Sequence, residues 1–324
     1  MSLNKIFYSF LILFIVNYST ITFAQTSSET TAVELEEIVV TAQRREQNIS
    51  DVSQAVQALS GDDLDELNIT NFEEMITLIP GAIQNSTISH GSNVYSIRGV
   101  AASETDGDAT VGYYLDNFAF SIPGRPYAPV TDLYDTERVE VLRGPSGTLY
   151  GLGSLGGTIK VITKDPVIGE FEGSFKATVS EIDDGDSSYT GDIVINAPIS
   201  DNAAIRAVLS IKDIGGWAEI IPSDQTDGNP YEALTGRLKL LVEPNEKTSV
   251  KFTYWRQDSE QEYANRLTYP SPPAIDNVFG ETFSDYTIYI LDVAYDLGFA
   301  MLESTTVYME NTVISNNGGF IPGI

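Results

Sequence analysis

The second half of the chain is dominated by segments of about ten residues in which apolar and polar positions alternate. In one segment Phe171, Phe175 and Val179 share one face, whereas Glu172 and Lys176 share the other. This period of two predicts about seven strands with one apolar face, as in a transmembrane barrel or a soluble β-sandwich. Two further strands carry basic residues on the polar face: Ile205, Ala207, Leu209 and Ile211 alternate with Arg206, Ser210 and Lys212, and Val250, Phe252 and Tyr254 alternate with Lys251 and Thr253.

The connections between these strands differ in length. Short turns are expected at 198–202, 243–247 and 296–298, and long loops with proline and aspartate at 215–230 and 258–284. Short and long connections interleave in outer-membrane barrels, so the lengths favour a barrel over a sandwich. Five tyrosines are candidates for the aromatic girdles of such a barrel: Tyr263, Tyr269, Tyr286, Tyr289 and Tyr295.

The first half of the chain mixes short helices with strands. Ser60 is expected to cap a helix that ends near Leu67, with Asp63 in the capping-box position. Thr70, with Glu73, is expected to cap a second helix that ends near residue 80. Strands of a small mixed sheet are expected at 94–100, 111–116, 138–142 and 158–163. The expected fold class is an α+β domain with a small mixed sheet and short helices, followed by antiparallel transmembrane β-barrel strands.

A glycine-rich loop separates the last two of those strands. Its Gly151-x-Gly153-x-x-Gly156 run matches the dinucleotide-binding fingerprint of oxidoreductases. That fingerprint requires a helix to open on its last glycine, because the helix N-terminus holds the pyrophosphate. A β-prone run follows here, so we reject this interpretation.

The N-terminus has the three parts of a secretory signal peptide. Lys5 supplies the positive start, residues 6–16 the apolar region, and Thr22-Phe23-Ala24 the small residues before the cleavage site. No other stretch reaches the roughly 20 apolar residues of a transmembrane helix. An exported chain that enters a second membrane must therefore do so as a barrel.

Composition excludes several classes of function. The chain carries 18 basic against 46 acidic residues, a formal charge of −28, whereas nucleic-acid binding requires a basic surface. It has no cysteine and one histidine, His90, so disulfides and thiolate metal sites are excluded and a transition-metal centre is not expected. We expect no nucleic acid, no resident metal and no cofactor.

Four motifs follow one another in the first half. Residues 138–166 read RVEVLRGPSGTLYGLGSLGGTIKVITKDP, preceded by LIPG at 78–81, IRG at 97–99 and VGYYLD at 111–116. In this order they resemble the plug domain of TonB-dependent outer-membrane receptors, which has LxxLPG, IRG, VGVYVDG and VLRGP…GTLYG motifs. One departure is GLGSLGG at 151–157, where the family has GRNSxGG, and it removes the contacts of an Arg and an Asn.

Residues 35–42, LEEIVVTA, form a short β-prone segment after a polar terminus. By pattern alone it is either the first strand of the next domain or an edge that a partner binds by β-augmentation. It resembles the TonB box in position and pattern. The resemblance implies that TonB, with the inner-membrane ExbB–ExbD motor behind it, binds the following residues: Glu36, Glu37, Ile38, Val39, Val40 and Thr41.

The resemblance also implies a division of the chain and a set of site residues. It gives a signal peptide at 1–24, a mobile N-terminus with the TonB box at 25–45, a plug at 46–166 and barrel strands in outer-membrane lipid at 167–324. Because arginines of two plug motifs pair with barrel glutamates in the family, Arg98 and Arg143 are expected to hold the plug in the barrel. Candidate ligand contacts at the plug apex are His90, Arg125 and Tyr127.

The function that the resemblance implies is TonB-dependent transport of an iron–siderophore, or another small-molecule metal chelate, across the outer membrane, without enzymatic activity. Cobalamin or an oligosaccharide is the alternative ligand, and a soluble periplasmic plug-like binding module is the alternative class. The iron of a chelate arrives already coordinated, so the receptor needs no metal ligands. Plugged barrels have about 22 strands, so about seven strands indicate a fragment of a longer receptor.

The signal peptide generates a first prediction. Exported protein should begin at Gln25, because cleavage follows the small-x-small pattern that ends at Ala24. N-terminal sequencing of the protein from the outer-membrane fraction measures this directly, and Met1 retained on exported protein would contradict it.

Overall fold

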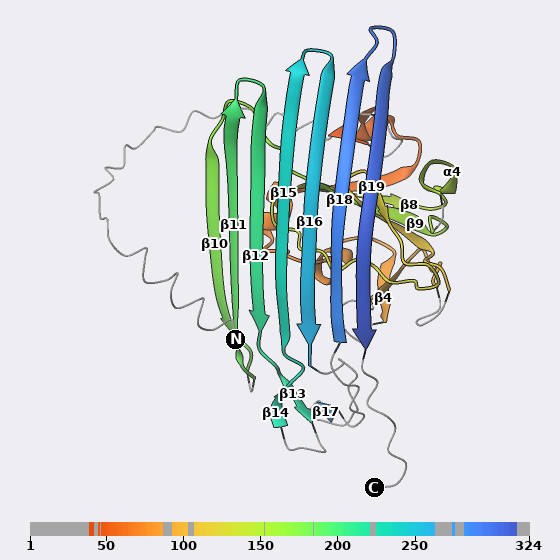
Figure 1. Cartoon of the computed structure of the whole chain (residues 1–324). Helices are drawn as coiled ribbons and strands as arrows, with labels where there is room; N and C mark the ends of the chain where they lie inside the picture. Colours follow the sequence, from red (N-terminus) through yellow and green to blue (C-terminus); the bar gives the residue numbers. More distant parts are fainter. Residues whose placement is uncertain are drawn as a thin grey trace, which may run out of the picture. The chain divides into compact units, whose positions relative to one another are not determined.

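The computed structural model describes residues 39–41, 45, 47–86, 93–102, 107–151, 153–183, 185–220, 225–262, 274–275 and 282–315. All of them fall within one compact unit of the chain. They form an N-terminal domain, up to residue 165, and a sheet of seven long strands (Figure 1). The predicted signal peptide, residues 36–38 and His90 lie outside the described residues. None of the helices in the described part of the chain has the length and apolar character needed to span a membrane.

A mixed sheet forms the centre of the N-terminal domain, as the strand pattern predicted. Strands β6 and β9 are parallel, and the other neighbours are antiparallel. The predicted run at 94–100 does not join this sheet, because its strand pairs instead with the strand that follows the turn at Pro80 and Gly81. The order is β3 (Ala55–Ser60), β8 (Thr136–Arg143), β9 (Gly157–Thr163), β6 (Val111–Leu115) and β7 (Phe118–Phe120), and the separate pairs are β4 (Ala82–Ser86) with β5 (Val94–Ile97) and β1 (Val39–Val40) with β2 (Gln47–Asn48).

Short helices complete this domain: η2 (Ile49–Asp51), α2 (Gly61–Glu66), α3 (Phe72–Ile76) and α4 (Gly147–Tyr150). The capping box of Ser60 and Asp63 at the start of α2 is confirmed. The cap predicted at Thr70 is wrong by one residue, because the side chain of Asn71 accepts a hydrogen bond from the Glu74 N–H. Glu74 completes this cap by accepting the Thr70 N–H at 2.8 Å.

One apolar core joins the N-terminal domain to the seven-stranded sheet. On the domain side, α3 buries Phe72 and Met75 against the buried faces of the mixed sheet. On the other side, Trp255, Tyr286 and Ile288 of the seven-stranded sheet belong to the same cluster of buried residues. Apolar burial therefore holds the two parts together, at about 25 cal/mol for each Å² removed from water.

The seven-stranded sheet is an antiparallel meander (Figure 1). The predicted strand type and strand number are confirmed, and apolar side chains such as Phe175 and Val179 are exposed on one face while Arg206 is buried on the other. The second long loop is shorter than predicted, and the first contains a hairpin, β13 (Ala218–Ile220) and β14 (Gln225–Gly228), which β17 (Ala274–Ile275) joins. The long strands are β10 (Glu172–Glu181), β11 (Ser187–Ser200), β12 (Ala203–Ile214), β15 (Tyr231–Asn245), β16 (Thr248–Gln261), β18 (Thr282–Asp296) and β19 (Met301–Ser315).

Of the tyrosines proposed for the girdles, Tyr289 and Tyr295 are exposed on the outer face. Tyr286 was assigned wrongly, because its position in β18 has the opposite parity and turns its side chain to the N-terminal domain. Its hydroxyl donates to the Val130 carbonyl at 2.8 Å. Tyr263 and Tyr269 lie outside the described residues.

Close packing at one glycine generates a second prediction. A Cβ at Gly157 would lie 2.4 Å from the Leu142 carbonyl oxygen, a backbone atom that cannot move away. Gly157→Ala should therefore lower the stability of the N-terminal domain by about 3 kcal/mol.

The matched control is Gly147→Ala, where no atom lies within 4 Å of the added carbon. This change should alter stability by less than about 1 kcal/mol. Thermal melting and protease resistance of the two purified variants provide the measurement, and equal effects would contradict the packing argument.

Candidate functional site

Acidic side chains of the N-terminal domain meet basic side chains of the seven-stranded sheet. All but two of these side chains are less than one sixth exposed, which is unusual for charged groups unless they are paired. We call these residues the charged interface: Asp116, Asp132 and Asp135 on the domain, Asp165 where the connection from the domain to β10 begins, Arg206, Lys212, Arg237, Lys239 and Lys251 on the inner face of the sheet, and Glu172 at its edge.

Asp135 is the centre of one half of this interface. It accepts a hydrogen bond from Arg206 Nε at 2.9 Å and one from Arg237 Nη2 at 3.1 Å, and its side chain is 3% exposed. Its φ of 58° lies in the left-handed region, which an aspartate tolerates better than most residues. Arg237 also lies over the ring of Trp255, 5.1 Å from the centroid, so the contact combines ionic, hydrogen-bond and cation–π terms.

Lys239 is the centre of the other half. Its ammonium group lies 2.7 Å from Asp165 Oδ1 and 3.1 Å from Asp116 Oδ2, and it also donates to the Thr163 carbonyl at 3.0 Å. Lys251 donates to the second oxygen of Asp165 at 2.7 Å. Asp116 has a φ of 51° and accepts the Thr163 N–H, so the turn between β6 and β7 fixes its carboxylate.

The strand register explains why acids from another domain are required. Arg206 and Lys239 are direct partners across β12 and β15, and like charges in that position repel each other. Carboxylates from the N-terminal domain reach both cations, so the ion pairs form between the two parts of the chain. Removing one member of such a buried pair leaves an uncompensated charge, which costs about 3–5 kcal/mol.

A further contact lies at Asp132. Its carboxylate is 3.1 Å from Lys212 Nζ and accepts the Ser210 hydroxyl at 2.6 Å. Burial by itself raises the pKa of Asp132, but Lys212, Ser210 and the Tyr134 N–H outweigh it and lower the pKa below its ordinary value. Burial also raises the pKa of Asp116, and Lys239, Lys251, the Thr163 N–H and Arg237 lower it to about 2.

The described part of the TonB-box-like segment is paired with the rest of the chain. Strand β1 (Val39–Val40) is antiparallel to β2 (Gln47–Asn48), and Val40 is fully buried in a second apolar cluster with Tyr114 and Tyr150. The N–H of Thr41 donates to Glu140 Oε1 at 2.8 Å, and its hydroxyl accepts from Lys160 Nζ at 2.9 Å. Both interpretations of the segment stay open, because a strand that pairs with its own domain can also be an edge that a partner binds.

The structure does not bring the predicted site residues together at the charged interface. Arg98 lies beside Gly144, and Arg143 donates to the Pro80 carbonyl at 3.4 Å, both within the N-terminal domain, so their pairing with barrel glutamates stays a prediction. Arg125 is exposed, and its guanidinium lies 6.0 Å from the centroid of the Tyr127 ring. Their contact with a ligand also stays a prediction.

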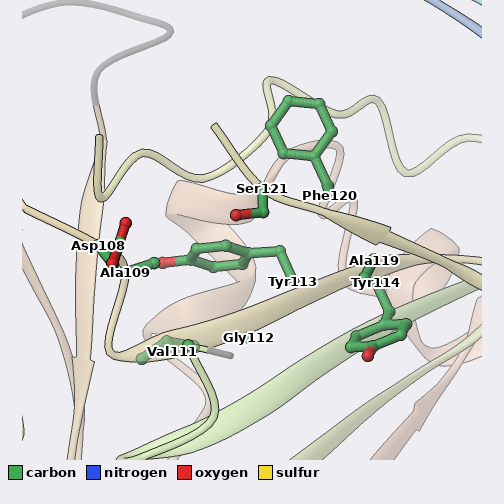
Figure 2. A pocket seen from close by; sticks show the side chains of 10 residues that line it. Asp108, Ala109, Val111, Gly112, Tyr113, Tyr114, Ala119, Phe120 and Ser121 are labelled. Atoms are coloured by element: carbon green, nitrogen blue, oxygen red, sulfur yellow. The ribbon is translucent and has the colours of Figure 1, made fainter. Parts of the chain in front are cut away.

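A small cavity lies beside the hairpin of β6 and β7 (Figure 2). Tyr113 and Tyr114 are neighbours on β6 and both line the cavity, with the side chain of Tyr113 beside Asp108 and Ser121. Its volume of about 20 Å³ suits about one water molecule. Sites for small-molecule ligands measure about 300–1,000 Å³, so this cavity cannot hold a chelate.

The sequence pattern placed some of the charged interface and missed the rest, including Arg237 and Lys239. Arg206, Lys212 and Lys251 were predicted on the polar face of their strands. Their acidic partners lie in turns, where carboxylates are usually solvated, so nothing local marked them. Buried cations on the inner face of a strand require carboxylates, and that requirement was the available signal.

Comparisons with known proteins agree with this architecture. Residues 48–158 match the TonB-dependent Receptor Plug Domain family. The chain is 28% identical over 229 residues to the pesticin receptor of Yersinia pestis, and 26% identical over 235 residues to the vitamin B12 transporter BtuB of Vibrio vulnificus. These alignments cover 69% and 71% of this chain but 32% and 36% of the relatives, so the chain spans about a third of their length.

Solved structures share the fold. The ferric yersiniabactin uptake receptor FyuA of Yersinia pestis matches with a TM-score of 0.68 at 18% identity, over 83% of this chain and 43% of that one. The ferripyoverdine receptor of Pseudomonas aeruginosa matches with a TM-score of 0.69 at 17% identity, over 86% of this chain and 37% of that one.

A plug domain with a mixed sheet, packed on antiparallel barrel strands, defines a class of plugged barrel proteins. This chain is similar to the TonB-dependent receptors over the plug domain and the seven strands that follow it, so the resemblance recognised from the motifs is confirmed. The N-terminal domain is hereafter the plug, and the seven-stranded sheet the wall.

The lowered pKa values generate a third prediction. A carboxyl whose pKa falls on folding stabilises the folded state above its unfolded pKa, and this stabilisation disappears as the pH falls through the folded value. For Asp116 the shift from 3.8 to about 2 corresponds to about 2 kcal/mol, so plug docking should weaken between about pH 4 and pH 2. The variant Asp116→Asn should lose most of this acid sensitivity.

Fluorescence of Trp255 in a Trp217→Phe background reports on this interface, because the chain has two tryptophans. Melting curves of the purified receptor at several acidic pH values provide the measurement. The control Asp201→Asn, in an exposed turn of the wall, should keep the acid sensitivity of the unmodified protein. A profile for Asp116→Asn as steep as that of the control would contradict the assignment.

Proposed function

We propose that this chain is part of an outer-membrane receptor that transports a scarce ligand, an iron–siderophore or another iron complex, by a TonB-dependent mechanism. The observation that carries the proposal is the plug held against the inner face of a barrel wall by buried ion pairs and a shared apolar core. A plug in that position blocks the barrel and must move before a ligand can pass. The protein acts as a transporter and not as an enzyme.

The ligand class is supported by the names of several relatives. Matching proteins include a ferripyoverdine receptor and the ferric yersiniabactin uptake receptor, both of which take iron complexes according to their names. The similar vitamin B12 transporter supports cobalamin as the second candidate. Competition between a ferric chelate and cobalamin for uptake by cells that carry the receptor distinguishes the two.

Energy for the movement would come from TonB, driven by the ExbB–ExbD motor. In this proposal residues 36–41 are the segment that TonB binds by β-augmentation. Val40 and Thr41 are held by the plug in the described state, so TonB must either pair with the residues before them or release β1 from β2. A soluble plug-like module has no use for the exposed apolar face of the wall, which supports the membrane location.

A fourth prediction tests the coupling. In the complete receptor, Ile38→Pro should abolish energised uptake and leave ligand binding nearly intact, because proline removes a backbone N–H and fixes φ. Val39→Ala keeps the backbone donor and removes part of a side chain that is already 45% exposed, so its effect should be milder.

The measurement pairs equilibrium binding of a labelled ferric chelate to whole cells with its uptake into them, with and without an uncoupler of the proton-motive force. Normal uptake by the proline variant would mean that residues 35–42 are an ordinary strand of the plug. Uptake that survives the uncoupler would count against TonB-dependent transport itself.

A further inference from the structure

Four basic side chains form a compact group on the inner face of three adjacent wall strands. Arg206 belongs to β12, Arg237 and Lys239 to β15, and Lys251 to β16. In the strand register, Arg206 lies opposite Lys239. The partner of Lys239 on β16 is Thr253, and Lys251 lies two positions before Thr253 on the same face. We call these four residues the basic wall cluster. The chain has only 18 basic against 46 acidic residues, so this concentration of positive charge runs against its composition.

The neutralising carboxylates come mainly from outside the wall. Within the described part of the chain, the carboxylates in ion-pair distance of Arg237 and Lys239 are Asp135, Asp116 and Asp165, all from the plug or the connection that follows it. Lys251 pairs with Asp165. Arg206 differs, because it contacts Glu172 of β10 in addition to Asp135.

Movement of the plug would separate these charges. Asp116 and Asp135 lie in turns of the plug sheet and leave with it. Asp165 lies in the connection to β10, which Asn196 of the wall holds through the backbone of Val167 and Glu170, so Asp165 stays near the wall. The four cations would then face the open passage with only Asp165 and Glu172 of their described ion-pair partners beside them. Arginine and lysine side chains that line a pore favour anions.

We propose that the basic wall cluster becomes the surface along which the ligand passes once the plug has moved, and that it selects a ligand with net negative charge. Chelates whose catecholate or carboxylate oxygens outnumber the charge of the bound metal are of this class. The inference rests on the proposed function. It adds the sign of the ligand's charge and names the residues that recognise this charge. While the plug is docked, its own carboxylates occupy the same cations.

Two variants separate this role from a purely structural one. Lys251→Gln and Asp165→Asn break the same ion pair, but the first removes a positive charge from the wall and the second removes a negative charge. A structural role predicts the same effect for both. A role in ligand passage predicts opposite effects on anions. Lys247→Gln, in the exposed turn between β15 and β16, changes the net charge as much as Lys251→Gln does and serves as the matched control.

The first experiment uses potassium chloride as the probe. The complete receptor is placed in a planar bilayer, its plug is displaced reversibly with urea, and the reversal potential in a salt gradient gives the permeability ratio of chloride to potassium. Lys251→Gln should lower this ratio by up to roughly fivefold, the factor that one charge a few ångströms away gives in water. Asp165→Asn should raise it, and Lys247→Gln should leave it unchanged. Equal ratios for the unmodified receptor, Lys251→Gln and Asp165→Asn would overturn the inference.

The second experiment compares uptake of a neutral ferric tris-hydroxamate with that of a trianionic ferric tris-catecholate. Lys251→Gln should slow uptake of the anionic chelate relative to the neutral one, and equal slowing of both would contradict charge selection. Failure of the unmodified receptor to import either chelate would count against the proposed function. The reversal potentials would still decide the inference in that case.

Discussion

The structure depends on a repulsion that is built into the wall and relieved by the plug. Arg206 and Lys239 are direct neighbours across two strands, on a face that is removed from water. Neither cation could remain buried without carboxylates, and Asp135, Asp116 and Asp165 supply them. Each part of the chain therefore stabilises the other: the wall would be strained without the plug acids, and those acids would be buried without counter-charges if the wall were apolar. The apolar core around Trp255 and Tyr286 excludes water from this contact and strengthens it.

Strand β8 links the wall contact to the N-terminal segment. Asp135, which pairs with Arg206 and Arg237, directly precedes β8, and Glu140 in the middle of the strand accepts hydrogen bonds from Thr41. Strands β3 and β9 flank β8 in the mixed sheet. A force applied near residue 40 would thus reach β8 through Glu140, while the beginning of the strand is held on the wall. The described geometry gives a direct mechanical connection between the proposed TonB-binding segment and the attachment of the plug.

Much of the fold could be predicted from the sequence because it depends on local periodicity. The alternation from Phe171 onward indicated the wall strands, and the side of Arg206 and Lys251 in those strands followed from parity. The alternation of the strand was not applied to Tyr286, which was proposed for the aromatic girdle because it is a tyrosine, although its position in β18 faces inward. The acid partners could not be predicted, because Asp116, Asp132 and Asp135 contact residues of the wall that lie far away in the sequence. Asp135 and Arg206, for example, are 71 positions apart. The pairing of Val39 and Val40 with β2 was equally hidden, since a two-residue strand has no period.

Two acids of the charged interface, Asp116 and Asp135, combine a short carboxylate with a left-handed backbone. Glycine and asparagine tolerate that backbone but carry no charge, and glutamate carries the charge but adopts the conformation less readily and places its carboxylate one methylene farther out. Aspartate alone meets both demands. A single substitution at either position therefore loses the charge or strains the backbone, and loss of the charge leaves the wall cations without a counter-charge. The manner in which the plug is attached to the wall should therefore change only through paired substitutions on both sides of the interface.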